Sequence, residues 1–183
     1  MREETMPSYA DRTVRLLAGQ LGEVPPLSAD RWAAVEEAIG LALPEDCRSL
    51  VSRTGSIIVD EWLTVYGPDD VEAGDLGSLV REREEAWTIL RRGGVPLREE
   101  YLAGRRRLIA FASVDAAYFY WRADPAVAPE KWGVVLVDGD LTGWYPYEMP
   151  ATEVLYKVLV GEIVPPPVEG LFGQAGHEVE RFG

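Results

Sequence analysis

Residues 31–51, RWAAVEEAIGLALPEDCRSLV, predict two short helices joined by a tight break. Trp32, Val35 and Ile39 are spaced three and four apart, so they form one apolar stripe along the first helix. Gly40 follows this stripe and is a natural end for the helix, because glycine readily adopts the left-handed conformation found there. The stretch holds no evident catalytic residue.

The second helix of this pair begins at Pro44. Proline suits the first turn of a helix, where its missing N–H would have no partner in any case. Cys47, Leu50 and Val51 form the inner face, and Gly55 ends the helix. Cys47 is the single cysteine of the chain, which excludes an intramolecular disulfide and a metal cluster built on cysteine. Its apolar position predicts a buried structural thiol.

The rest of the sequence predicts strands in consecutive runs. The expected elements are β-structure at 56–67, a helix at about 76–92, strands at 108–113, 116–123, 132–137 and 142–148, and a closing helix at 151–161. The last two strands pair across Asp138-Gly139-Asp140, where the Asp-Gly step favours a hairpin turn. Consecutive strands of this kind predict an α+β fold with a single mixed or mostly antiparallel sheet flanked by helices.

The chain divides into three predicted segments. Residues 1–27 form a helical leader, whose amphipathic helix at 7–21 we expect to pack on the main domain or on another subunit. Residues 28–163 form the main domain. Residues 164–183 form a Pro/Gly-rich tail, in which we expect three consecutive prolines to forbid regular structure.

The excess of acidic residues narrows the classes of molecule that the chain is expected to bind. The sequence has 18 basic and 31 acidic residues, a formal net charge of −13. Such a surface repels nucleic acid and anionic membranes, and it attracts basic partners. The rate of association with a basic partner should fall as the salt concentration rises. Solubility alone explains the charge equally well. No stretch approaches the roughly 18 apolar residues of a membrane span, and no signal peptide is evident, so we expect a cytoplasmic protein without a membrane partner.

Motifs for nucleophilic or metal-dependent enzymes are missing from the sequence. It has no P-loop and no dinucleotide-binding glycine fingerprint. His177, the single histidine, lies beyond the prolines of the tail, which disfavours a catalytic triad and, with one cysteine, a zinc site. Asp138 and Asp140 flank a glycine and could hold a hard cation, but they equally suit a hairpin turn, which we favour. An enzyme that uses a glycosidase-like pair of carboxylates is a further alternative, although nothing singles out two of the 31 acidic residues. We expect no cofactor or metal.

Acidic residues are concentrated in residues 60–75, DEWLTVYGPDDVEAGD, which contain six acids and no base. Solvated loops and helix ends are one explanation. The other is an acidic surface for a basic protein partner, with aromatic side chains as anchors. The candidate partner-binding residues are Asp60, Glu61, Trp62, Tyr66, Asp69, Asp70, Glu72 and Asp75. By contrast, residues 91–107 hold six arginines and two glutamates; they could bind phosphate or RNA, but no glycine cradle or aromatic interleaving supports this.

The opening stretch resembles the start of the SUKH superfamily, the Smi/Knr-type domain. The resemblance is carried by Trp32-x-x-Val35-Glu36, Ile39-Gly40, Leu43-Pro44 and Gly55. Later pieces agree in order, and they are LTVYGP (63–68), YFYWRAD (118–124), WGVVLVDGDLTGWY (132–145) and EVLYKVLVGE (153–162). The similarity covers residues 28–163. The sequence departs from the family at Cys47, where an aromatic is usual, at Gly55-Ser56, where a glycine pair is usual, and in its long connection 91–107.

This resemblance implies an α+β fold without enzymatic activity. Many bacterial members are immunity proteins that bind and neutralise toxins, often nucleases, and fungal members are regulatory scaffolds. We therefore expect a protein-binding module, most simply an immunity protein that occludes a basic, nuclease-like toxin domain. A regulatory or scaffold domain without a toxin is the alternative. The family-signature residues, Trp32, Val35, Glu36, Leu43, Pro44 and Gly55, are expected to be structural.

Overall fold

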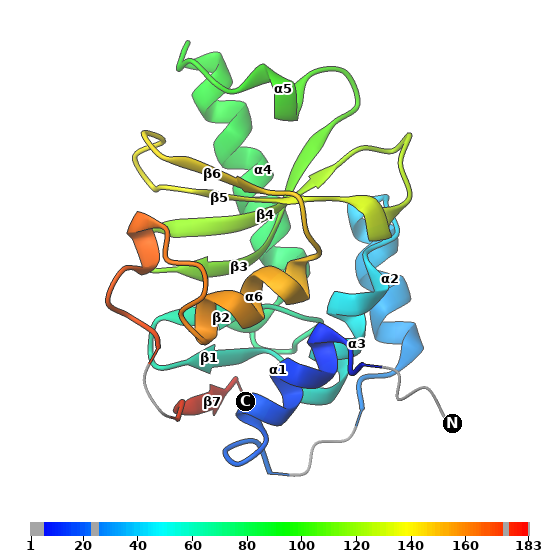
Figure 1. Ribbon diagram of the computed structural model, residues 1–183. Helices are drawn as coiled ribbons and strands as arrows, with labels where there is room; N and C mark the ends of the chain where they lie inside the picture. The colour runs from blue at the N-terminus through cyan, green and yellow to red at the C-terminus, as the bar shows by residue number, and fades with distance from the viewer. Residues whose placement is uncertain (1–5, 23–25, 174–175, 183) are drawn as a thin grey trace.

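The computed structural model describes residues 6–22, 26–173 and 176–182 (Figure 1). Its helices are α1 (Tyr9–Leu17), α2 (Ala29–Ile39), α3 (Glu45–Thr54), α4 (Leu76–Arg92), α5 (Glu99–Leu102) and α6 (Ala151–Leu159). Its strands are β1 (Ile57–Val59), β2 (Leu63–Val65), β3 (Arg107–Val114), β4 (Ala117–Ala123), β5 (Val134–Val137), β6 (Trp144–Tyr147) and β7 (Val179–Arg181). Single 3-10 turns lie at η1 (Glu72–Gly74), η2 (Pro129–Lys131) and η3 (Pro166–Val168).

Within the described ranges, the strands form one sheet in the order β6-β5-β4-β3-β2-β1-β7. Every neighbouring pair is antiparallel. The predicted α+β fold with a mostly antiparallel, helix-flanked sheet is therefore confirmed. No helix in these ranges combines the length and the apolar character needed to cross a bilayer.

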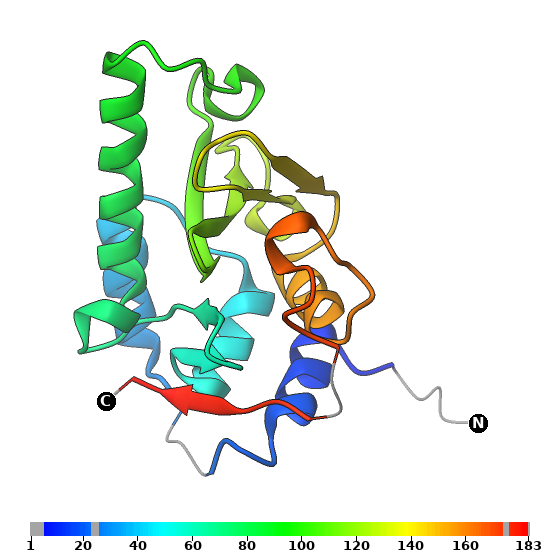
Figure 2. The ribbon, with the colours of Figure 1, turned by 90° about the vertical axis from the view of Figure 1, so that its left-hand side faces the viewer.

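Both faces of the sheet are covered by helices. Figure 2 shows α4 along one face, with α6 and α1 on the opposite side. On β3, Leu108 and Ala110 pack in the cluster beneath α4, whereas Ile109 and Phe111 belong to the main core. Because successive strand residues point to opposite faces, a strand buried on both sides needs an unbroken apolar run. This requirement accounts for the sequence LIAFA at 108–112.

The two-helix stretch at 31–51 folds as predicted. Gly40 ends α2 with a left-handed φ of 78° and donates its N–H to Glu36 O. The Glu36 carboxylate then closes the break between the helices, because its Oε1 accepts from Leu43 N at 2.8 Å and from Arg48 at 3.3 Å. Pro44 lies at the N-cap of α3, one residue before the predicted first turn. Glu36 thus links α2 to α3 through these hydrogen bonds.

The other residues on which the SUKH resemblance depends lie in or beside the core. Trp32, Val35, Leu43 and Pro44 are buried. The indole N–H of Trp32 donates to Ser52 Oγ at 2.9 Å, which ties α2 to α3. Gly55 caps α3 with a φ of 71°, a left-handed conformation that other residues adopt only with strain.

The leader helix α1 packs on the main domain, one of its two expected positions. Ser8 and Asp11 form a reciprocal capping box at its start. Asp11 also pairs with Arg53 of α3 at 2.8 Å. The ring of Tyr9 lies 5.7 Å from that of Tyr156 in α6. The leader is therefore an integral layer over α3 and α6.

The expectation that the tail holds no regular structure is wrong. Beyond the prolines, β7 pairs antiparallel with β1, with Ile57 opposite Arg181 and Val59 opposite Val179. The prolines act only locally, since they lie in and beside the single turn η3. The edge of β1 supplies unpaired backbone groups, and the chain returns to satisfy them. The sheet thus ends with a strand that local sequence analysis did not predict.

Candidate functional site

The eight predicted partner-binding residues separate into two groups. Asp60, Glu61 and Trp62 form the turn between β1 and β2, at one end of β2. The other five, Tyr66, Asp69, Asp70, Glu72 and Asp75, lie beyond the opposite end of β2, on the segment that leads to α4. Because β2 lies between the two groups, acids that are close in sequence are separated in space.

Two of the predicted acids shape the segment between β2 and α4. Asp75 is the N-cap of α4, and its carboxylate accepts from Ser78 N at 2.8 Å and from Asp69 N at 3.3 Å. Asp69 in turn accepts from Val71 N at 2.9 Å. These carboxylates satisfy backbone groups that no helix or strand would pair. Their primary role in the fold is to position this segment.

Asp70 also has a partner within the protein. Its Oδ1 lies 2.7 Å from Nη2 of Arg31 in α2, although its side chain remains 94% exposed. A pair this exposed contributes little to stability. Of the five residues in this group, Tyr66 and Glu72 are the ones that open onto a concave surface.

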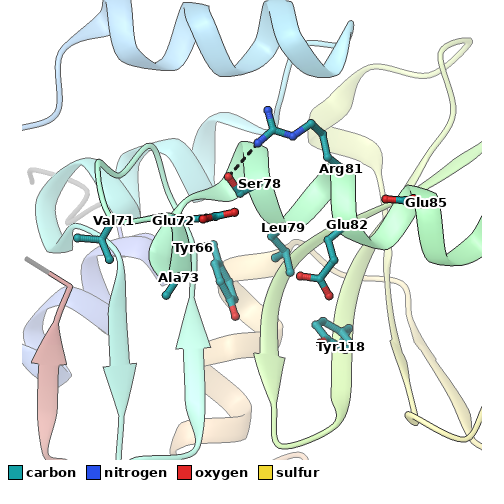
Figure 3. Close-up of a pocket in the computed structure, with 10 residues that line it drawn as sticks. All are labelled: Tyr66, Val71, Glu72, Ala73, Ser78, Leu79, Arg81, Glu82, Glu85 and Tyr118. Atoms are coloured by element: carbon teal, nitrogen blue, oxygen red, sulfur yellow. Dashed lines mark hydrogen bonds between the residues drawn. The ribbon is translucent and has the colours of Figure 1, made fainter.

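That surface is a groove of about 740 Å³ between η1 and α4 (Figure 3). Glu72 comes from η1, Arg81, Glu82 and Glu85 come from α4, and the aromatic rings are those of Tyr66 and Tyr118. We call this the acidic groove and define it by these six residues. Glu82 and Glu85 were not among the predicted site residues. They were detectable, because glutamates three apart on the predicted helix 76–92 share one face with Leu79.

The charges in the acidic groove leave a negative excess. Glu72, Glu82 and Glu85 are all exposed. Arg81 is the opposing charge, and its guanidinium donates to Ser78 Oγ at 3.1 Å. Glu82 pairs with the neighbouring Arg83 at 2.6 Å. Within the described ranges Glu72 and Glu85 form no ion pair, so their carboxylates are free to meet an incoming cation.

The two tyrosines give the acidic groove an aromatic component. The hydroxyl of Tyr66 lies 3.1 Å from Ser113 Oγ, and burial raises the pKa of Tyr66, so the phenol stays neutral. The guanidinium carbon of Arg83 lies over the ring of Tyr118, 4.4 Å from the ring centre. Aromatic faces beside carboxylates suit a guanidinium or ammonium group, which gains both the ring quadrupole and an opposite charge. Because Arg83 already covers one face of Tyr118, a basic side chain of a partner would meet the exposed carboxylates of Glu72 and Glu85 beside these rings.

The second group of predicted residues surrounds a separate hollow of about 470 Å³, lined in part by Asp60, Glu61, Trp62, His177 and Glu178. The His177 side chain is only 2% exposed, and its Nδ1 lies 2.6 Å from Asp60 Oδ2. Asp60 Oδ1 accepts from Glu178 N at 2.8 Å. Asp60 and Glu61 have left-handed φ values of 53° and 63°. Trp62 is 45% exposed beside the hollow, as an anchor residue would be.

His177 was missed as a structural partner of Asp60. The two residues are 117 positions apart, and no local pattern links them. Their pairing depends on the return of the tail to β1. Among the described residues, no group of three or more histidine, cysteine or carboxylate side chains is arranged to bind a metal ion.

Four of the six arginines in the connection 91–107 pair with nearby carboxylates. Arg91 pairs with Glu99 at 3.8 Å, and Arg98 pairs with Glu100 at 3.6 Å. The two further pairs of this region are Arg106 with Asp124 and Arg107 with Glu84. Arginines already engaged with carboxylates are poor ligands for a phosphate backbone, which needs uncompensated positive charge.

Comparisons of the chain with family models, with curated proteins and with solved structures found no match.

Proposed function

We propose that this protein is a non-enzymatic protein-binding module that receives a basic surface of its partner in the acidic groove. The observation that carries the proposal is the placement of Glu72 and Glu85, without ion pairs in the described ranges, beside the rings of Tyr66 and Tyr118. A net charge of −13 attracts a basic partner from a distance. The groove then supplies local contacts that slow dissociation.

We further propose that the partner is a toxin domain, most simply a nuclease, and that the protein neutralises it in the cytoplasm. The SUKH resemblance of residues 28–163 supports this choice. A nuclease must present basic side chains to bind phosphates, and an acidic protein seated on those side chains excludes the substrate. The mechanism is occlusion, which needs no catalytic residue.

A regulatory or scaffold domain is the second candidate function. The same acidic groove would serve it, so the two candidates differ in the consequence of binding. If the captured partner is toxic alone and harmless when co-expressed, the immunity proposal stands. Toxicity that persists despite complex formation counts against it.

The test begins with affinity capture from the native cell and continues with the purified basic domain that is recovered. The double variant Glu72→Lys/Glu85→Lys reverses two charges in the groove. A control, Glu162→Lys/Glu169→Lys, makes the same change in net charge at exposed positions outside the groove. We expect the groove variant to lose at least roughly tenfold in affinity and to show a flatter salt dependence, with the control close to wild type.

Equal affinity of the groove variant and the wild type would refute this placement of the site. Reversal of Asp69 or Asp75 is a poorer test, because these carboxylates accept backbone hydrogen bonds of the segment. A loss of binding in those variants would also follow from simple disorder of the segment.

A further inference from the structure

The C-terminal residues 176–182 lie across the lower edge of the molecule and touch parts of the chain that are far apart in sequence (Figure 2). We call this segment the strap. Its middle is β7, which pairs with β1. At one end His177 meets the turn between β1 and β2. At the other end Phe182 reaches η1, the turn that carries Glu72 of the acidic groove.

The contact between Phe182 and η1 is close. A β-carbon added to Gly74 would lie 2.6 Å from Cγ of Phe182, a separation that real β-carbons do not show. The ring therefore lies directly over the glycine backbone, and Gly74 is buried. Since η1 is a single turn that also contributes Glu72 and Ala73 to the groove, Phe182 supports the groove wall through Gly74.

The rest of the strap is fixed to the body of the protein by polar contacts. Arg181 donates to Thr54 O at 3.0 Å, and its guanidinium also donates to Leu21 O of the leader. Asp60 and Glu178 exchange two hydrogen bonds at 2.8 Å, one from each backbone N–H. These contacts hold Phe182 in place without involving any residue of the groove.

Two backbone hydrogen bonds, from Gly74 N to Val71 O at 2.9 Å and from Asp75 N to Glu72 O at 3.2 Å, form the turn η1 of the groove wall. The carboxylates of Asp69 and Asp75 fix the two ends of the segment, whereas Val71, Glu72 and Ala73 between them are exposed. The hydrogen bonds of a single 3-10 turn have poorer geometry than those of an α-helix, so they hold the turn less firmly. The position of Glu72 therefore depends on what packs behind η1.

We infer that the strap is a positioning device for the acidic groove, with Phe182 as the positioning residue that holds η1 and Glu72 in the geometry that receives a cation. Release of the strap weakens recognition of a basic side chain while the sheet and α4 stay folded. The inference rests on the proposed function for its consequence in binding. The positioning itself is measurable without any ligand.

The test uses two changes that reach the contact from opposite sides. Phe182→Ala removes the ring. Gly74→Ala leaves the ring and every groove residue unchanged but forces them apart, and the φ of Gly74 lies outside the left-handed region, so alanine fits its backbone. Gly19→Ala is the matched control, because a β-carbon there meets nothing within 4 Å. Phe182→Tyr keeps the ring and serves as the rescue variant.

Two readouts are applied to the full chain. The first is amide hydrogen exchange by mass spectrometry on peptides covering residues 68–78. We expect Phe182→Ala and Gly74→Ala each to speed exchange there by roughly fivefold or more, with β3–β6 unchanged and with Phe182→Tyr and Gly19→Ala like wild type. In the double variant the two effects should not add, because they break one contact.

The second readout is fluorescence polarisation with a labelled hexa-arginine peptide, whose affinity should fall by roughly three- to tenfold in both single variants. Unchanged exchange at 68–78 in both single variants, or additive effects in the double variant, overturns the positioning role. Faster exchange with no change in hexa-arginine affinity overturns its link to binding. If wild type does not bind hexa-arginine, the proposed groove function falls, and the exchange data alone decide the positioning role.

Discussion

Asp46 in α3 caps a helix more than a hundred residues away, and its removal should be costly. Its Oδ2 accepts from Thr152 Oγ1 at 2.7 Å and from Thr152 N at 3.2 Å. Thr152 lies in the first turn of α6, whose N-cap is Pro150, a residue without a side-chain acceptor. Asp46→Ala removes a helix cap, a loss of about 1 kcal/mol. It also leaves donors on a residue that is 2% exposed without an acceptor, which costs about 1–3 kcal/mol more.

The expected loss is therefore about 2–4 kcal/mol in the free energy of unfolding, or roughly 5–12 °C in Tm for a chain of this length. Urea unfolding of Asp46→Ala, Thr152→Val and the double variant measures it. The double variant should lose less than the sum of the single variants, because both changes break one interaction. Glu169→Ala, at an exposed position, is the control. A loss below about 0.5 kcal/mol for Asp46→Ala, or strict additivity, refutes the reasoning.

Three further predictions concern the core, the thiol and the leader. Trp121→Ala should lower the free energy of unfolding by about 3–5 kcal/mol in urea titrations, since its buried ring stacks 4.6 Å from Phe111. Cys47 should react with Ellman's reagent only on unfolding, because burial shields the thiol and raises its pKa. Hydrogen bonds from Ser8 and Arg53 hold the pKa of Asp11 below its usual 3.8; its stabilisation is present above that value and lost as pH falls through the folded pKa. Urea titrations of Asp11→Asn should therefore show a shallower loss of stability below about pH 4.

Local signals in the sequence account for most of the helices. The helix predicted at about 76–92 coincides with α4, because Asp75 caps its start and a glycine follows its end. The hairpin across Asp138 also forms, but the left-handed residue in it is Leu141, with a φ of 63°. Gly139 is needed for another reason, since a β-carbon there would lie 2.7 Å from Ala116 O. The sequence predicted a turn at Asp138-Gly139, but it did not predict why glycine is needed at position 139.

The site was less predictable than the fold. The count of acids along residues 60–75 placed in one group side chains that lie at opposite ends of β2 in the structure. The acidic groove takes Glu72 from that segment but draws Glu82 and Glu85 from α4. A linear charge count cannot find such a site, because it depends on which face of a helix lies beside which loop. The role of Phe182 depends on the pairing of β7 with β1, for which the sequence offers no local signal.

The pairing of β7 with β1 also sets an order of events during synthesis. The outer edge of β1, which includes Ile57, is covered only after Arg181 has emerged from the ribosome. Until then, the nascent chain presents β1 as an open edge, to which another strand can add. Contacts this distant in sequence are slow to form, because a long loop must close first. Translation speed and chaperone access between the synthesis of β1 and that of β7 should therefore influence the yield of folded protein.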